Sequence, residues 1–385
     1  MDKNTVLIIS PTFLPVIGGS EVYSNDLCGY LSKHGWQVNL VTCTPPLKGK
    51  YGLVEKKGNL CIMRIPCLSK RVIEKSTEHP IIYPLFIVPP LLLYSFFFML
   101  RYYREIDVIH AQSVSAGFVV MILAALFKKK SVVTTHGKYF SDNPYHLQYN
   151  KYVKFIKWVL SSFDKVLAIN KQSRDELLAV GIPADKIIIA PHWVDQQVFV
   201  PLDKKTSKKQ AGWQGKFVIL FAGRFVEDKG VSQVIAASRL TRRDIIFAFI
   251  GTGPLEAMIA EAARNQHNVI NLGKVANEEM PMYYNAADLI LVPSRHAGDG
   301  IPRVITEALS CGTPVIGANR GGIPDVVNSS VGLIIEPTAE EIKTAIEILF
   351  ADKNKLESLA VACRNYAVRN FSAKNAEIVE ESYYG

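Results

Sequence analysis

Short, almost purely apolar runs recur along the first half of the chain, separated by longer segments that are apolar on one side only. Runs of this kind are typical of buried parallel strands, and the segments between them are typical of helices that cover a sheet. The first such helix is predicted behind Ser20, a candidate N-cap, and should end at Gly35. A hairpin rich in Lys and Gly is predicted over residues 46–58. The predicted strands are residues 6–9, 38–43, 60–65, 107–111, 131–137, 165–170 and 187–189.

The same alternation restarts after a polar, basic stretch. Residues 201–215 show no hydrophobic periodicity, which predicts a linker between two domains. A chain of 385 residues is long for a single core. We therefore predict two α/β, doubly wound domains, residues 1–200 and residues 216–370, and a helical tail from Glu340. The strands predicted in this half are residues 217–221, 245–250, 269–274 and 289–292 and a strand that begins at Pro314.

Residues 81–100 carry no charged side chain and are rich in aromatic residues. Prolines at positions 84, 89 and 90 predict that only about ten residues form uninterrupted helix, too few to span a bilayer. Apolar anchors beside cations suit a protein lying on an anionic membrane surface. The alternatives are a helix that packs on the sheet and a transmembrane helix. The flanking cations are Arg71, Lys75, Arg101 and Arg104.

Positive charge is concentrated in the first half. Residues 1–200 contain 23 Lys and Arg against 14 Asp and Glu, whereas residues 201–385 contain 21 of each. The lysines of the predicted linker are not interleaved with aromatic side chains, so we expect no nucleic-acid binding. The six cysteines form no C-x-x-C pair, which predicts reduced thiols. The first four residues lead straight into a strand, so we expect no signal peptide. Together with the reduced thiols, the basic first half and the apolar segment at residues 81–100, this predicts a cytoplasmic protein that is peripheral at the inner face of the membrane.

The candidate ligand-binding residues are concentrated around residues 288–327. A loop at residues 294–301 joins a buried strand to a helix that opens near Pro302, and helix N-termini bind anions well. Two carboxylates, Asp299 and Glu307, frame this loop. After the strand at 217–221, Arg224 and Lys229 would converge on the strand's end and match a pyrophosphate. Solvated surface cations are the alternative interpretation of that pair.

These motifs resemble glycosyltransferase family 4. The family's Glu-x7-Glu signature is matched at Pro293, Ser294, Gly300, Glu307, Ala308 and residues 311–316, whereas Asp299 replaces the first Glu and is shorter by one methylene. The block from Gly223 to Gly230 is similar to the family's Gly-Arg…Lys-Gly motif. Further likenesses are the glycine loop at Gly18 and Gly19, the histidine at His136, the turn at Gly251 and Gly253, and the strand ending at Lys274, which commonly meets the nucleobase. By this resemblance, the four glycines and Lys274 are expected to bind the nucleotide sugar.

The resemblance implies the GT-B fold, in which two Rossmann-like domains face each other across a cleft, with a terminal helix (residues 371–385) returning to the first domain. It implies retaining transfer of a hexosyl group from a UDP- or GDP-linked sugar to a hydroxyl acceptor. Arg224, Lys229 and the helix near Pro302 would stabilise the departing diphosphate. No metal or other cofactor is then expected, and consistently the chain has no Asp-x-Asp motif.

In the same family, the second acidic residue of the signature holds the donor ribose, a role that falls to Glu307. Asp299, Gly300 and Ile301 would face the transferred sugar, and His136 would approach it from the first domain. A lipid-linked acceptor is expected from the basic first half and the apolar segment. Two alternatives stay open: a nucleotide-sugar epimerase of similar fold and a catalytically silent nucleotide-sugar-binding subunit.

Overall fold

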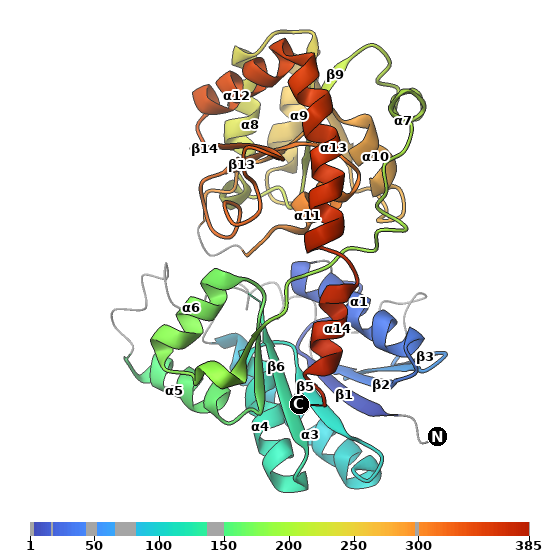
Figure 1. Ribbon diagram of the computed structural model, residues 1–385, viewed down its shortest axis with the longest axis vertical. Helices are drawn as coiled ribbons and strands as arrows, with labels where there is room; N and C mark the ends of the chain where they lie inside the picture. The colour runs from blue at the N-terminus through green and yellow to red at the C-terminus, as the bar shows by residue number, and fades with distance from the viewer. Residues whose placement is uncertain are drawn as a thin grey trace. The chain divides into compact units, whose positions relative to one another are not determined.

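The computed structural model describes residues 4–16, 18–43, 52–65, 82–136, 150–296 and 300–384. The chain forms two compact units (Figure 1). The first contains Met1–His192 and Ala376–Gly385, and the second contains Trp193–Asn375. The chain therefore enters the second unit just after His192 and returns to the first near the start of its terminal helix.

The first unit is built on a sheet with strand order β3-β4-β2-β1-β5-β6-β7-β8. All neighbouring strands are parallel except β3 and β4, which are antiparallel. Strand β3 lies inside the predicted hairpin, of which residues 46–51 are outside the described residues. The strands are β1 (Thr5–Ser10), β2 (Gln37–Thr42), β3 (Val54–Lys57), β4 (Leu60–Arg64), β5 (Val108–Ala111), β6 (Lys130–Thr135), β7 (Lys165–Ala168) and β8 (Ile187–Ile189).

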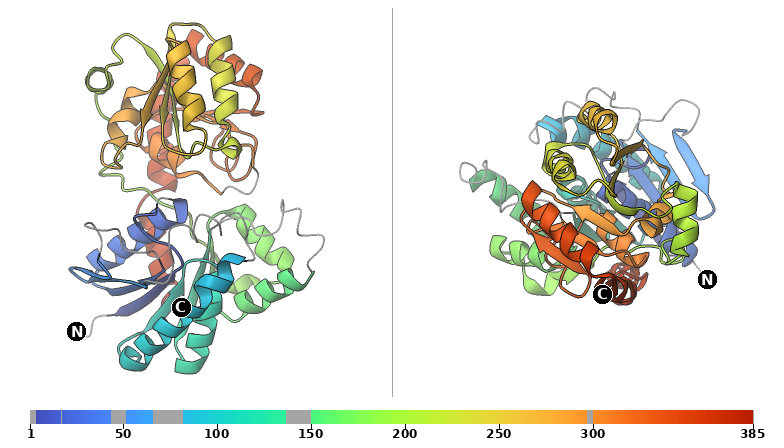
Figure 2. Two further views of the ribbon diagram at one scale, coloured as in Figure 1. Left: turned by 180° about the vertical axis from the view of Figure 1, so that it is seen from behind. Right: turned by 90° about the horizontal axis from the view of Figure 1, so that it is seen from above.

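Helices cover both faces of this sheet. Helices α1 and α14 lie on one face, and α3 lies on the other, against α4 (Figures 1 and 2). Side chains follow this division, because Leu7 and Ile9 of β1 join the core under α3 and α4. Gly18, not Ser20, is the N-cap of α1, so that prediction is wrong by two residues. The helices are α1 (Gly19–Lys33), α3 (Ile82–Tyr102), α4 (Val114–Phe127), α5 (Asn150–Ser161), α6 (Lys171–Val180) and α14 (Lys374–Glu381).

Helix α3 corrects the prediction for residues 81–100. It runs without a break through Pro89 and Pro90, where we expected a helix of about ten residues. Each proline removes one backbone donor, yet the helix is retained because Ile87, Leu91 and Met99 are fully buried against the core shared with α4. Packing of one face outweighs the local cost of the prolines.

The second unit is built on an all-parallel sheet with strand order β11-β10-β9-β12-β13-β14. Its strands are β9 (Phe217–Ala222), β10 (Ile245–Ile250), β11 (Val269–Gly273), β12 (Leu289–Val292), β13 (Val315–Ala318) and β14 (Gly332–Ile335). Its helices are α7 (Lys204–Ala211), α8 (Val231–Leu240), α9 (Glu256–Asn265), α10 (Met280–Ala286), α11 (Arg303–Ser310), α12 (Ala339–Ala351) and α13 (Lys353–Asn370), with a short 3₁₀ turn, η2 (Glu227–Lys229).

Helix α7 occupies residues predicted to be an irregular linker, so that prediction is wrong for this segment. Asp203 caps the helix by accepting a hydrogen bond from the Thr206 N–H at 2.8 Å. Lys204 and Lys208 form ion pairs with the buried Asp288, at 3.1 and 2.6 Å, next to the start of β12. A carboxylate about eighty residues further along the chain therefore fixes two lysines of the predicted linker.

In both units the first strand lies at the point where the strand order reverses. Strand β1 lies between β2 and β5, and β9 lies between β10 and β12. In doubly wound sheets, ligands bind outside the carboxyl ends of the strands at this switch point. The loops after β1 and β5, and those after β9 and β12, are therefore the places to look for a site.

Candidate active site

The loops after β9 and β12 contact each other directly. The Arg295 N–H donates to the carbonyl of Asp228 at 2.8 Å, which joins the loop after β12 to turn η2. Gly230 follows η2 with φ +77°, and a Cβ at this position would meet the carbonyl of Pro293. This glycine is therefore required by a close approach of the two loops. The segments singled out at residues 224–230 and 293–302 are neighbours in the fold.

Arg224 and Lys229 lie in the first of these loops. Arg224 is exposed and Lys229 is half-buried. Between them the fully buried ring of Phe225 anchors the turn, and the Phe225 N–H donates to the Thr252 carbonyl at 2.9 Å. A rigid backbone thus presents an exposed guanidinium at the carboxyl end of β9.

Packing explains the two glycines of the turn after β10. Gly251 and Gly253 have φ of +150° and +159°, and a Cβ on either would overlap the backbone of Gly223 or Phe225. The Gly251 N–H is used, since it donates to the Gly273 carbonyl at 2.8 Å. These glycines have a structural role, and their predicted contact with a nucleotide stays a prediction. Lys274, also predicted to bind, is exposed beyond β11, the edge strand of the sheet.

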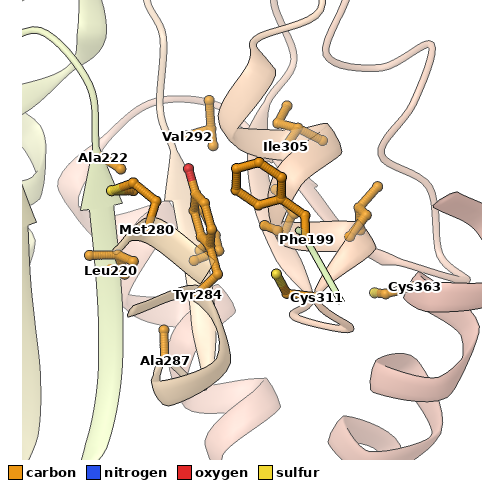
Figure 3. Packing of buried hydrophobic residues seen from close by; sticks show 14 of the residues in the cluster. Phe199, Leu220, Ala222, Met280, Tyr284, Ala287, Val292, Ile305, Cys311 and Cys363 are labelled. Atoms are coloured by element: carbon orange, nitrogen blue, oxygen red, sulfur yellow. The ribbon is translucent and has the colours of Figure 1, made fainter. Parts of the chain in front are cut away.

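Glu307 lies in α11 and is buried beside two donors. The Tyr284 hydroxyl donates to its Oε2 at 2.8 Å, and the Arg303 Nε donates to its Oε1 at 3.2 Å. Tyr284 is fully buried in the core of the unit, where it packs near Phe199 (Figure 3). Burial and the Glu307 carboxylate raise the pKa of Tyr284 well above its usual value, so the hydroxyl remains a donor. Glu307 is thus held in one orientation by α10 and by its own helix.

The loop predicted at residues 294–301 leads into the N-terminus of α11. Pro302 is the N-cap and offers no side-chain acceptor to the first-turn N–H groups. Gly300 and Ile301 precede it and are half-buried. Asp299 lies outside the described residues, so its predicted role is a prediction only.

In the first unit, His136 follows β6 and contacts a side chain from the loop after β5. Its Nε2 lies 2.9 Å from Oε1 of Gln112, an oxygen that only accepts, so Nε2 carries the proton and Nδ1 the lone pair. Nδ1 is buried and has no hydrogen-bond partner among the described residues. Burial lowers the pKa of His136 to about 4. His136 is therefore a neutral imidazole whose buried Nδ1 keeps its lone pair as an unused hydrogen-bond acceptor among the described residues.

A second buried histidine supports this arrangement. His110, at the end of β5, lies 2.6 Å from the Tyr383 hydroxyl and 2.8 Å from Thr134 Oγ1, and Gln112 Nε2 lies 3.3 Å from its Nε2. Burial lowers the pKa of His110 to about 3. Gln112 therefore joins the two histidines and orients the ring of His136.

Acidification will destabilise the first unit through these histidines. Their pKa values in the folded chain, about 4 and about 3, lie below the unfolded value. The unfolded chain therefore binds more protons below pH 6.5, and stability falls as the pH falls through that window by about 2 kcal/mol per histidine between pH 7 and pH 5. Urea unfolding at both pH values measures the loss. His136→Gln should remove about half of the histidine contribution, and the exposed control His267→Gln should leave it intact.

The glycine loop after β1 contains an unexpected carboxylate. Gly18 is the N-cap of α1, and a Cβ there would overlap the Glu21 carboxylate, whereas a Cβ on Gly19 would meet no described atom within 4 Å. The buried Glu21 accepts hydrogen bonds from Thr12 Oγ1 at 2.5 Å and from Ser20 Oγ at 3.0 Å. Gly18 is thus explained by packing, and Gly19 leaves open space at this edge of the sheet.

Sequence reasoning missed several residues of these sites. Arg303 was detectable, because it precedes Glu307 by four positions on one helix face. Gln112 follows a predicted strand at the ligand-bearing edge, which was also a usable signal. Tyr284 and Glu21 gave none, since their partners are set by tertiary packing. No described group of three or more His, Cys, Asp or Glu side chains could hold a metal ion.

Solved structures with the same architecture are glycosyltransferases. The sucrose-phosphate synthase of Thermosynechococcus elongatus is similar over 99% of this chain and 98% of its own, with a TM-score of 0.82 at 21% sequence identity. Anabaena Alr3699/HepE, solved with UDP, is similar over 99% of both chains, with a TM-score of 0.75 at 19% identity. The protein therefore has the GT-B fold, as the sequence motifs predicted.

Family models match both units. The model described as Glycosyltransferase Family 4 matches residues 17–198, and the model described as Glycosyl transferases group 1 matches residues 203–367. The chain belongs to glycosyltransferase family 4, which confirms the resemblance, and it is a glycosyltransferase.

Two curated relatives act on phosphatidylinositol lipids according to their names. The GDP-mannose-dependent alpha-(1-6)-phosphatidylinositol monomannoside mannosyltransferase of Mycolicibacterium smegmatis is 28% identical over 54% of this chain and 58% of its own. The phosphatidylinositol N-acetylglucosaminyltransferase GPI3 subunit of Saccharomyces cerevisiae is 24% identical over 87% of this chain and 72% of its own. The chain thus spans less than two thirds of the first relative and more of the second.

Proposed function

We propose that this protein transfers a hexosyl group, with retention, from a UDP- or GDP-linked sugar to a hydroxyl of a lipid-linked acceptor, in the assembly of a polysaccharide or glycolipid. The main support for the proposal is the contact between the loops after β9 and β12 at the switch point of the second sheet. One presents Arg224 and Lys229, and the other leads to Glu307. The lipid acceptors named for the two curated relatives support the acceptor class.

Breaking the anomeric bond leaves negative charge on the nucleotide diphosphate. Arg224 and Lys229 stabilise this charge from the loop after β9. The first-turn N–H groups of α11, to which the N-cap Pro302 offers no side-chain acceptor, add the positive end of a helix dipole. Cations of the chain itself serve here in place of a metal ion. The leaving phosphate oxygen takes the proton of the acceptor hydroxyl, so no protein base is needed.

Other residues position the donor. Glu307 accepts hydrogen bonds from the ribose diol, and its carboxylate is held in one orientation by the Tyr284 hydroxyl and the Arg303 guanidinium. Asp299, Gly300 and Ile301 contact the transferred sugar. On the first unit, the Nδ1 of neutral His136 accepts a hydrogen bond from a sugar hydroxyl, and Gly19 leaves room for a ligand.

A lipid-linked acceptor places the enzyme at a membrane. Helix α3 is long and apolar enough over Pro84–Tyr102 to cross a bilayer, but its buried face belongs to the core of the first unit. We therefore propose a cytoplasmic protein that lies on the inner face of the membrane without crossing it.

Release of nucleotide diphosphate separates this function from its alternatives. The purified chain, in EDTA, is incubated with UDP- and GDP-sugars, with and without a polyprenyl phosphate-linked sugar or phosphatidylinositol. Acceptor-dependent release with an α-linked product from an α-linked donor supports the proposal. Epimerisation without an acceptor indicates the epimerase, and binding without turnover indicates the silent subunit. Activity that needs an added divalent cation would contradict the metal-free mechanism.

Tyr284→Phe will weaken donor binding with little effect on the chemical step. The ring stays in the core, but Glu307 loses one of the two donors that orient it. Loss of a buried hydrogen bond to a carboxylate should lower stability by about 1.5–3 kcal/mol and raise the donor KM severalfold, with kcat nearly unchanged. The neighbouring Tyr283→Phe, on a ring that packs against Trp213, is the matched control. Equal donor KM values for the two variants would rule out the positioning role.

A further inference from the structure

Three helices of the first unit share an unusual composition. Helices α3, α4 and α5 contain no Asp or Glu at all. The unit's other described helices, α1, α6 and α14, each contain at least two acidic residues. Helix α4 packs against α3 on one side and α5 on the other, so the three form one layer. Negative charge is therefore missing from the helices of a whole layer, not from a single segment.

Helix α3 has two apolar faces. Ile87, Leu91, Ser95 and Met99, spaced by four residues, are fully buried. On the opposite side, a stripe of large apolar side chains is 51–70% exposed; its members are Leu85, Phe86, Leu93, Phe97 and Leu100. A helix that only packed on the sheet would present polar residues there. The outer stripe is thus apolar surface that is exposed in the part of the chain that the structure describes.

Helix α5, which sequence reasoning did not identify, adds a second apolar patch. Ile156, Val159 and Leu160 are buried, whereas Phe155 and Trp158 are 41% and 57% exposed. Both exposed rings contact Phe118 of α4, with centroids 5.6 and 6.2 Å apart. The exposed Lys154 and Lys157 flank them along the helix. Exposed aromatic rings between lysines are typical of helices that lie in a membrane interface.

The carboxyl ends of α3 and α4 also combine aromatic side chains with neighbouring cations. Phe127 of α4 lies 5.9 Å from Phe96 of α3 and 5.9 Å from Tyr103 just beyond it, which joins the two helices through aromatic contacts. Beside this cluster lie the exposed cations Arg101, Arg104 and Lys128. The guanidinium groups of Arg101 and Arg104 lie over the rings of Tyr102 and Tyr103. The apolar stripe of α3 therefore ends in a group of positive charges.

We infer that the α3–α4–α5 layer is a docking surface for an anionic phospholipid bilayer. A bilayer supplies both partners that this surface lacks, hydrocarbon for the exposed apolar side chains and phosphate for the cations. A second copy of the chain would bring like charges together, which is unfavourable. This inference specifies how the enzyme of the proposed function would reach a lipid-linked acceptor, and it rests on the proposed function for that acceptor alone. The surface itself does not depend on donor binding.

Trp158 allows a direct test. It is exposed, whereas the chain's other tryptophans, Trp36, Trp193 and Trp213, are buried. The full chain is mixed with phosphatidylcholine vesicles, alone or with phosphatidylglycerol, and with vesicles carrying brominated acyl chains. The expected result is a blue shift and bromine quenching of Trp158 on the anionic vesicles, reversed by salt.

Paired variants measure the separate contributions of the lysines and of the exposed apolar side chains to vesicle binding. Lys154→Gln with Lys157→Gln should weaken partition onto anionic vesicles about 25-fold, because each lysine near the surface contributes about fivefold. Lys205→Gln with Lys209→Gln, exposed on α7, is the matched control and should change nothing. Leu93→Ser with Phe97→Ser should abolish the residual binding at high phosphatidylglycerol, and Ile348→Ser with Val361→Ser, exposed on the second unit, should not.

Three results would overturn the inference. The first is the absence of Trp158 quenching by anionic vesicles with brominated acyl chains. The second is a concentration-dependent shift of Trp158 fluorescence, with dimerisation, in the absence of vesicles. The third is resistance to carbonate extraction, which indicates a spanning helix. Thermal shifts with UDP and GDP are measured on the same preparation. Nucleotide binding without vesicle binding contradicts only the docking surface, and vesicle binding without nucleotide binding contradicts only the proposed reaction.

Discussion

Replacing Arg224 with alanine will lower kcat/KM by two to three orders of magnitude. The guanidinium meets charge that develops on the departing diphosphate, and removal of one such preorganised group costs about 3–4 kcal/mol in the transition state. Folding should be unaffected, because Arg224 is exposed and the turn is anchored by the backbone bonds of Phe225. Steady-state rates with a saturating acceptor, together with thermal unfolding, measure both effects.

Two variants sharpen this result. Arg224→Lys keeps the charge but loses the two-pronged donor geometry, so it should recover only part of the rate. Arg239→Ala, which removes an exposed arginine from the last turn of α8 in the same unit, should retain wild-type activity. An unchanged rate in Arg224→Ala would show that this guanidinium does not contact the leaving group.

Glu307→Gln will lose most of its affinity for the nucleotide. The carboxylate accepts from Tyr284 and Arg303 through different oxygens. Glutamine has one oxygen and one amide NH₂, so only one of these donors keeps its acceptor, and the bond to the other is lost or, at the Tyr284 hydroxyl, reversed. Each hydrogen bond to a charged group contributes about 1.5–3 kcal/mol, which predicts a Kd for UDP or GDP at least about tenfold weaker and a less stable second unit.

Nucleotides without the ribose diol test the assigned contact. The wild type should bind a 2′,3′-dideoxy nucleotide diphosphate more weakly than the parent nucleotide. Glu307→Gln should bind both nucleotides with the same affinity, because its contact with the diol is already lost. Glu341→Gln, in the exposed first turn of α12, is the control. If the variant still discriminated the two nucleotides as the wild type does, another group would hold the ribose.

Most strands were readable because their apolar runs are short, buried on both faces and bounded by turn residues. Strand β12 and strand β10 have the predicted bounds for this reason. Helices α3 and α7 were not readable. In α3, burial of one face outweighs two prolines, and in α7 the lysines are fixed by Asp288, far away in the sequence. Local rules fail where a distant partner supplies the stabilisation.

The candidate site shows the same division. Arg224, Lys229 and Glu307 were predicted from the motifs and the family resemblance, and the structure brings the segments that contain them to neighbouring strands. The environment of these residues was not predictable, because Tyr284 reaches Glu307 from another helix and Gln112 reaches His136 from the loop after another strand. Gly251 and Gly253 looked like ligand contacts, yet their conformations are explained by the backbone of the neighbouring loop.

The return of the chain to its first unit has a consequence for engineering. The Asn4 side chain donates to the Tyr384 hydroxyl at 3.0 Å, so these two positions are adjacent. The tail is also held by Trp36, whose indole N–H donates to Glu380 at 2.8 Å. A short peptide could therefore join residues 4 and 384, and new ends could be opened at the exposed turn around Gly58. Such a circular permutant should keep both cores, because no strand or helix would be cut.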